Sequence, residues 1–278
     1  MRVPHADGTV VRAPPEMTSD KKDDRALILM ADIFPTGFFG ARNAFAMLRD
    51  QRLPASEATV VVVGCGPVGL CAIVSALEYG PRKVFAVDSV PARLELARGL
   101  GAEPLDFAAP AGGREAVVKR VLEVTEGRGA DAVIEVVGLS PALRTAFELI
   151  RPFGVISSIG VHNAEVRLLL GGLGSGFADR LARFRGTATR RISRFCFVCL
   201  GVVYVLTGNS KNVKVQMGRC PVRSIFPEAL PVLVKNQDKF RWVNPMSEER
   251  CVLTVAASCS TRSCRSRRRL RGTTCLTR

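Results

Sequence analysis

A glycine-rich segment that follows a short apolar run constrains the fold of this chain more than any other feature. Four valines at 60–63 lead directly into Gly64-Cys-Gly-Pro-Val-Gly69, and a second apolar run, Val84-Phe-Ala-Val87, ends at Asp88. A strand, a Gly-x-Gly-x-x-Gly turn, a helix and a second strand that ends in an acid are typical of a dinucleotide site. The first-turn amides of the helix would bind the pyrophosphate, and Asp88 would accept hydrogen bonds from a ribose.

Each glycine of this segment has its own expected role. Gly64 lets the chain turn sharply off the strand, Gly66 leaves room for a pyrophosphate, and Gly69 lets the helix approach the sheet closely. A plain glycine-rich turn in an unrelated α/β protein is the alternative. The acid in register with the second strand favours the dinucleotide site.

Short β-branched runs alternate with helical segments up to about residue 165, which predicts an α/β fold with a doubly wound parallel sheet. We expect strands at 60–63, 84–88, 103–107, 131–137, 155–160 and 211–217. We expect helices at 67–79, 91–99, 114–125, 141–150 and 224–236. Ser140 would cap the fourth of these helices, and Pro231 would kink the last or delay its start. Residues 26–50 suggest two helices separated by a break at Pro35-Thr-Gly37.

The basic charge of the chain is confined to its second part. Residues 1–165 carry 18 Lys and Arg against 20 Asp and Glu, whereas residues 166–278 carry 22 against 5. One alternative is therefore a basic interaction protein whose Arg-rich stretch at 262–271 binds nucleic acid or directs the chain to the nucleus. A solvated charge run explains the same residues, and no nucleic-acid-binding signature accompanies them, so we do not expect a nucleic-acid partner.

The cysteines do not indicate a zinc site, and the apolar runs do not indicate a membrane protein. Cys65 and Cys71 fall in apolar surroundings, and Cys196-x-x-Cys199 has a metal-ligand spacing but no second pair to complete a zinc site. The longest apolar run, at 195–206, is too short to span a membrane, and the first residues lack a secretory signal. We expect no membrane association and a cytoplasmic location.

Taken together, the ordered segments resemble the zinc-type medium-chain alcohol dehydrogenases, and among them the branch of sorbitol and formaldehyde dehydrogenase-like enzymes. The matching stretches are Asp32-Ile-Phe-Pro-Thr-Gly37, Val63-Gly-Cys-Gly-Pro-Val-Gly-Leu70, Val87-Asp-Ser-Val-Pro-Ala-Arg-Leu94, Ala132-Val-Ile-Glu-Val-Val-Gly138, Ser158-Ile-Gly-Val161 and Lys211 to Asp238. The resemblance implies an oxidoreductase that moves a hydride between an alcohol or aldehyde and the nicotinamide of NAD. A homo-oligomer is compatible with it.

The resemblance also implies which residues hold the cofactor. The pyrophosphate would lie against Gly64, Gly66, Pro67, Val68 and Gly69. Asp88 would bind the ribose and Arg93 would lie by the adenine. The nicotinamide side would be lined by Thr36, Val137, Gly138, Ile159, Gly160 and Val161. A carboxylate at Asp88 favours NAD, because it repels the 2′-phosphate of NADP.

Upstream of the glycine segment the chain departs from the family pattern. Members of the family begin with a catalytic domain that supplies Cys and His zinc ligands, whereas residues 1–63 contain no Cys and a single His, His5. Asp32 is a position where the branch can place a zinc ligand, and its context argues against a zinc-free, quinone-reductase-like member. One carboxylate cannot hold a catalytic zinc, which needs about three protein ligands. We therefore expect an N-terminally truncated chain with no intact catalytic set and little activity alone.

These observations predict five segments. Residues 1–50 would be a remnant of the catalytic domain with linker helices, and 51–165 the Rossmann NAD-binding domain. Residues 166–210 would be a disordered insert foreign to the family. Residues 211–240 would be the last Rossmann strand and helix, and 241–278 a basic disordered tail.

Overall fold

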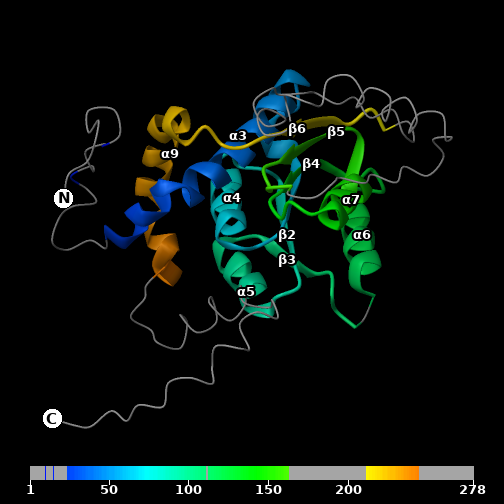
Figure 1. Cartoon of the computed structure of the whole chain (residues 1–278). Helices are drawn as coiled ribbons and strands as arrows, with labels where there is room; N and C mark the ends of the chain where they lie inside the picture. Colours follow the sequence, from blue (N-terminus) through cyan, green and yellow to red (C-terminus); the bar gives the residue numbers. More distant parts are fainter. Residues whose placement is uncertain (1–9, 11–14, 16–23, 111, 163–210, 244–278) are drawn as a thin grey trace, which may run out of the picture. The chain divides into compact units, whose positions relative to one another are not determined.

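A six-stranded parallel sheet organises the chain (Figure 1). Its strand order is β3-β2-β1-β4-β5-β6, and every neighbouring pair runs parallel. The strands are β1 (Thr59–Val63), β2 (Lys83–Asp88), β3 (Glu103–Asp106), β4 (Ala130–Glu135), β5 (Ile150–Ser158) and β6 (Lys214–Met217). Every residue of β1 and β4 is buried, as expected for central strands covered on both faces. The predicted doubly wound α/β fold is confirmed.

The computed structural model describes residues 10, 15, 24–110, 112–162 and 211–243. The chain divides into two compact units, Met1–Asn236 and Gln237–Arg278, and the sheet belongs to the first. In the second, the described residues form the 3-10 helix η3 (Gln237–Val243). The predictions for the Cys196–Cys199 pair, for 166–210 and for the Arg-rich stretch lie outside the described residues.

Helices cover both faces of the sheet. On one face lie α3 (Ile33–Asp50), α4 (Pro67–Leu77) and α5 (Pro91–Leu100), and α6 (Gly113–Val124) and α7 (Ser140–Leu149) lie on the other (Figure 1). Two short 3-10 helices, η1 (Asp24–Ala31) and η2 (Ala55–Glu57), flank α3, and α9 (Val222–Asn236) packs beside it. No helix among the described residues is long and apolar enough to cross a membrane.

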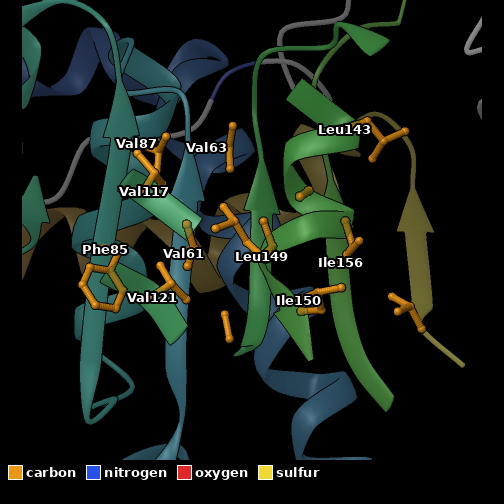
Figure 2. Packing of buried hydrophobic residues seen from close by; sticks show 14 of the residues in the cluster. Val61, Val63, Phe85, Val87, Val117, Val121, Leu143, Leu149, Ile150 and Ile156 are labelled. Carbon is orange, nitrogen blue, oxygen red and sulfur yellow. The ribbon is translucent and has the colours of Figure 1, made fainter. Parts of the chain in front are cut away.

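The hydrophobic core follows the two-residue period of the strands. Alternate residues of β1 and β2 point toward α6 and α7, where they meet Val117, Val121, Leu143 and Leu149 (Figure 2). These strand residues are Val61, Val63, Phe85 and Val87. Fully burying each such side chain contributes about 1.5–3 kcal/mol, so this layer and its counterpart under α4 hold the sheet together.

Helix α3 contradicts the break expected at Pro35-Thr-Gly37. The helix begins at Ile33 and runs without interruption to Asp50, so Pro35 is its third residue. A proline is tolerated there because the first N–H groups of a helix have no carbonyl partner inside it. Gly37 is a contact point, since a Cβ on it would lie 2.7 Å from the backbone nitrogen of Ala72 in α4.

Two other local predictions need correction. Helix α7 begins at Ser140 itself, with Leu139 at the N-cap and no side-chain cap, so Ser140 does not cap it. Helix α9 starts at Val222, so Pro231 does not delay its start, and the helix continues through both Pro227 and Pro231. Both prolines lie on its exposed face, where water can satisfy the carbonyls they leave free, while Ile225, Ala229 and Leu233 are buried.

Ion pairs join the residues after 210 to the first helices. Arg42 of α3 makes two hydrogen bonds to Glu228 of α9, at 2.7 and 3.2 Å. Glu78, just after α4, accepts hydrogen bonds from Lys235 at 2.5 Å and from Asn236 at 3.0 Å. Helix α9 is therefore an integral part of the unit that contains the sheet.

Candidate cofactor site

The loops at the carboxyl ends of β1, β4 and β5 form the candidate site. The strand order reverses its direction of growth between β1 and β4. In open α/β sheets, ligands bind at this reversal, outside the carboxyl ends of the strands. A Cβ on Gly64, after β1, would lie 2.7 Å from Cγ2 of Val137, after β4. The loops of the two strands are therefore in direct contact at this point.

The three glycines of the first loop differ in the space around them. Gly64 has a φ of +98°, which favours glycine, and a Cβ on Gly69 would lie 1.9 Å from the carbonyl oxygen of Gly64. Gly66, the N-cap of α4, has nothing within 4 Å of the position of its Cβ. The loop is thus packed tightly at Gly64 and Gly69 and open at Gly66, in front of the first-turn N–H groups of α4. This is the shape that a bound pyrophosphate requires.

Asp88, at the end of β2, is fixed by backbone N–H groups. Its Oδ2 accepts a hydrogen bond from Cys65 at 2.7 Å, and its Oδ1 accepts from Ser89 at 2.7 Å and Val90 at 3.0 Å. Nη1 of Arg93 lies 3.7 Å from Oδ2. A carboxylate offers about four acceptor positions, so three backbone bonds leave one for a ribose hydroxyl. The carboxylate therefore links the glycine loop to β2 and keeps an acceptor for a ligand.

Cysteine chemistry does not belong to this loop. The Cys65 side chain is buried, and burial, with a smaller contribution from the Asp88 carboxylate, raises the pKa of its thiol to about 12. Burial also raises the pKa of the Cys71 thiol far above its ordinary range. Both thiols stay protonated near neutral pH, and both pack as small apolar groups, as predicted.

The loops after β4 and β5 touch each other through glycine backbones. A Cβ on Gly160 would lie 2.1 Å from the nitrogen of Gly138, and a Cβ on Gly138 would lie 2.5 Å from the carbonyl oxygen of Val161. Val137 and Val161 are exposed at this edge, 42% and 48% respectively, so their side chains can meet a ligand. Ile159 is buried against Gly40 of α3, and only its backbone can contribute.

A buried polar cluster under these loops was missed by the sequence analysis. Glu135 is 0% exposed. Its Oε1 accepts hydrogen bonds from the N–H groups of Val137 at 2.8 Å and Gly138 at 2.7 Å. Its Oε2 accepts the hydroxyl of Ser158 at 2.6 Å and lies 3.3 Å from Nε2 of His162. The available signal was a single charged residue inside an apolar strand, Ala132-Val-Ile-Glu-Val-Val137.

Asp32 and Thr36 lie at the start of α3, where a Cβ on the next residue, Gly37, would lie 2.7 Å from the carbonyl oxygen of Val68 in α4. The Thr36 hydroxyl donates to Oδ1 of Asp32 at 3.1 Å. The Cys220 thiol donates to the carbonyl of Pro35 at 3.4 Å, and burial raises its pKa to about 11. The described residues contain no group of three His, Cys, Asp or Glu side chains that could hold a metal ion. The described residues therefore fit a dinucleotide, and no set of side chains among them fits a catalytic zinc.

Comparison with known proteins gives a consistent result. The family model described as zinc-binding dehydrogenase matches residues 67–186, and so continues past residue 165, where we expected family-like sequence to stop. Zinc-type alcohol dehydrogenase B of Aspergillus flavus is 50% identical over 239 residues, which are 86% of this chain and 45% of that protein. The medium chain reductase/dehydrogenase ucsI of Acremonium sp is 66% identical over 166 residues, which are 60% of this chain and 53% of that protein.

Solved structures agree with the fold. Alcohol dehydrogenase TADH from Thermus sp. ATN1 superimposes with a TM-score of 0.59 at 28% identity, over 84% of this chain and 53% of that one. A zinc dependent alcohol dehydrogenase 2 from Streptococcus pneumonia gives a TM-score of 0.62 at 24% identity, over 93% and 61% of the two chains, and supports the fold alone. The chain spans about half the length of the curated relatives named above.

Proposed function

Because the chain belongs to the zinc-type alcohol dehydrogenase family of oxidoreductases, we propose that its sheet unit binds NAD as the cofactor-binding part of such an enzyme. The carrying observation is the Asp88 carboxylate, which accepts the N–H of Cys65 in the glycine loop beside the open position at Gly66. The same carboxylate can therefore accept a hydrogen bond from the ribose and hold the loop that would bind the pyrophosphate.

Different residues are proposed to contact the pyrophosphate, the adenosine and the nicotinamide of NAD. The pyrophosphate would lie at Gly64, Gly66, Pro67, Val68 and Gly69, with Asp88 and Arg93 on the adenosine side. The nicotinamide would lie toward Val137, Gly138, Gly160, Val161 and the backbone of Ile159, with Thr36 at the start of α3. NAD, when bound, supplies the hydride acceptor for alcohol oxidation. In this proposal the chain orients the cofactor.

NAD is preferred over NADP in this proposal. The Asp88 side chain is 8% exposed and already carries three backbone donors. A 2′-phosphate placed beside this buried negative charge would be repelled, and Arg93 is positioned to neutralise only part of it.

Within the family, we propose the sorbitol and formaldehyde dehydrogenase-like branch, on the stretch from Asp32 to Gly37. We further propose that 51–165 and 211–240 form the NAD domain and that 1–50 derive from the end of a catalytic domain. We also propose a tail at 241–278, a cytoplasmic location, a homo-oligomer and an insert within 166–210, of which residues 166–186 fall inside the match to the family model. Hydride transfer to a small alcohol or aldehyde would need the zinc ligands that the described residues do not provide. The relatives and solved structures named above give the nucleic-acid alternative no support.

Gly66→Glu tests the proposal most directly. A Cβ at Gly66 has nothing within 4 Å, so we expect the fold to be retained while the new charge occupies the pyrophosphate position. Saturation with NAD at about a hundred times its Kd should stabilise the wild type by about 2.7 kcal/mol in thermal unfolding, and the variant should not respond. NADP should give a smaller stabilisation than NAD.

Gly99→Glu is the matched control, because Gly99 also has open space at its Cβ position and lies on α5. It makes the same change in charge and should keep the full response to NAD. A wild-type protein whose melting temperature does not change with NAD would refute the proposed function.

A further inference from the structure

The Glu135 cluster connects both loops of the nicotinamide half. The side chain of Glu135 binds the amides of Val137 and Gly138, and its backbone carbonyl accepts the N–H groups of Ile159 at 2.9 Å and Gly160 at 3.2 Å. These four residues are all among those assigned to the nicotinamide side. Their backbone positions therefore depend on one residue at the end of β4.

The hydrogen-bond directions within the cluster are determined by its donors. Ser158 has one hydroxyl proton, which it donates to Oε2 of Glu135. Its oxygen, 3.0 Å from Nε2 of His162, must then accept from that nitrogen. His162 thus carries a proton on Nε2 and covers the outer side of the cluster, where its side chain is 11% exposed against 0% for Glu135.

A buried carboxylate is costly unless its oxygens are hydrogen-bonded, and the same oxygens determine the loop conformation. Gly138 has a φ of +76° and Gly160 lies against it, so at these two residues backbone contacts alone hold the loop shape. Removing the acceptor at Oε1 would leave two adjacent N–H groups without a partner. The exposed side chains of Val137 and Val161 would then lose their fixed positions.

We propose, resting on the NAD site proposed above, that Glu135 is the positioning residue of the nicotinamide half of that site. It does not touch the cofactor. It acts through the amides of Val137 and Gly138, and Ser158 and His162 hold its carboxylate in the required orientation.

Two substitutions of similar volume separate the acceptor from the bulk of the side chain. Glu135→Gln keeps an oxygen for the two amides, whereas Glu135→Leu keeps the volume and removes the acceptor. Asp131→Leu is the matched control, because Asp131 is a second buried carboxylate on β4, 2% exposed, at the opposite edge of the sheet. It accepts the N–H of Thr59 at 2.8 Å and pairs with Arg151 at 2.6 Å, away from the loops.

The measurements are the Kd for NAD, by calorimetry on the full 278-residue chain, and the emission maximum of NADH bound at saturation. Circular dichroism defines a temperature at which each variant is folded. Glu135→Leu should raise the Kd about tenfold or more and move the emission of bound NADH toward that of free NADH. Glu135→Gln should stay within about threefold of the wild type, because the acceptor is restored. Asp131→Leu should lower the melting temperature and leave both readouts unchanged.

Three results would overturn the inference. One is a wild-type Kd and emission maximum in folded Glu135→Leu. Another is an equal loss in Asp131→Leu, which would mean that burial of any carboxylate on β4 affects the site only through stability. If Glu135→Leu does not fold, the milder variants Ser158→Ala and His162→Gln are measured instead, and we expect each to raise the Kd for NAD several-fold. An unchanged Kd in both variants is the third result that would overturn the inference. A wild type that fails to bind NAD refutes the proposed site itself, whereas binding without sensitivity at Glu135 refutes this inference alone.

Discussion

The two edges of the sheet are held together by different kinds of contact. At the amino edge, where the strands begin, the contacts are made by charged side chains. Asp131 pairs with Arg151, and Lys211 donates to carbonyls at the end of α7. At the carboxyl edge, glycine backbones touch one another, and the carboxylates of Asp88 and Glu135 bind backbone N–H groups. An edge that receives a ligand must leave room for it, so its contacts are made by the backbone. The carboxyl edge should therefore be sensitive to added atoms and the amino edge to removed charges.

The largest effect is expected for one methyl group added at the carboxyl edge. In Gly69→Ala the new Cβ would lie 1.9 Å from the carbonyl oxygen of Gly64, so backbone must move. We expect a loss of about 3 kcal/mol or more in the free energy of unfolding, measured by urea denaturation. Gly66 lies three residues earlier, but a Cβ there meets open space. Gly66→Ala should therefore change the free energy of unfolding by about 0.5 kcal/mol or less. Equal stability of the two variants would break the comparison.

A smaller but still large effect is expected for a charge removed at the amino edge. Asp131→Leu leaves the Arg151 guanidinium, 17% exposed, and the N–H of Thr59 without their buried partner. We expect a loss of about 2–3 kcal/mol in the free energy of unfolding, at the low end of the cost of breaking a buried pair because Arg151 keeps some water. The double variant with Arg151→Leu should recover part of this loss, and a full additive loss would contradict the pairing.

Among the charges of the amino edge, a smaller effect is expected for Lys211→Met. The Lys211 ammonium donates to the carbonyls of Phe147 at 3.0 Å and Ile150 at 2.9 Å, where it caps the end of α7. Its loss should cost about 1 kcal/mol in urea denaturation.

The pH dependence of the same variant provides a check. Burial lowers the pKa of Lys211 from its ordinary value of 10.5, so between the two values the unfolded state holds more protons than the folded state. Wild-type stability should therefore rise with pH as it approaches 10.5, and Lys211→Met should lack this rise. An identical pH dependence of wild type and variant would show that Lys211 does not titrate as its burial implies.

At the carboxyl edge, the sequence predicts the roles of those residues whose partners are close to them in the chain. The roles of Gly64, Gly66 and Gly69 follow from a strand, a turn and a helix that are contiguous in sequence, and so does the position of Asp88. Glu135 could not be assigned, because its partners Ser158 and His162 come from another strand and the loop after it. The break predicted at Pro35 was wrong because a proline in the first turn of a helix has no hydrogen bond to lose. Ser140 was misplaced by one residue, which is enough to change a cap into a first-turn residue.

Helix α3 has a consequence for how such a domain can be exchanged between proteins. Its Phe34, Phe45 and Leu48 are buried, and its Gly37 lies against the backbone of α4. A recombination event that joined a foreign domain at residue 50 would strip this apolar wall from the sheet and leave α4 uncovered. A transferable NAD domain that starts at residue 51, as proposed above, would therefore have to bring α3 with it, from Ile33 onward, in order to keep α4 covered.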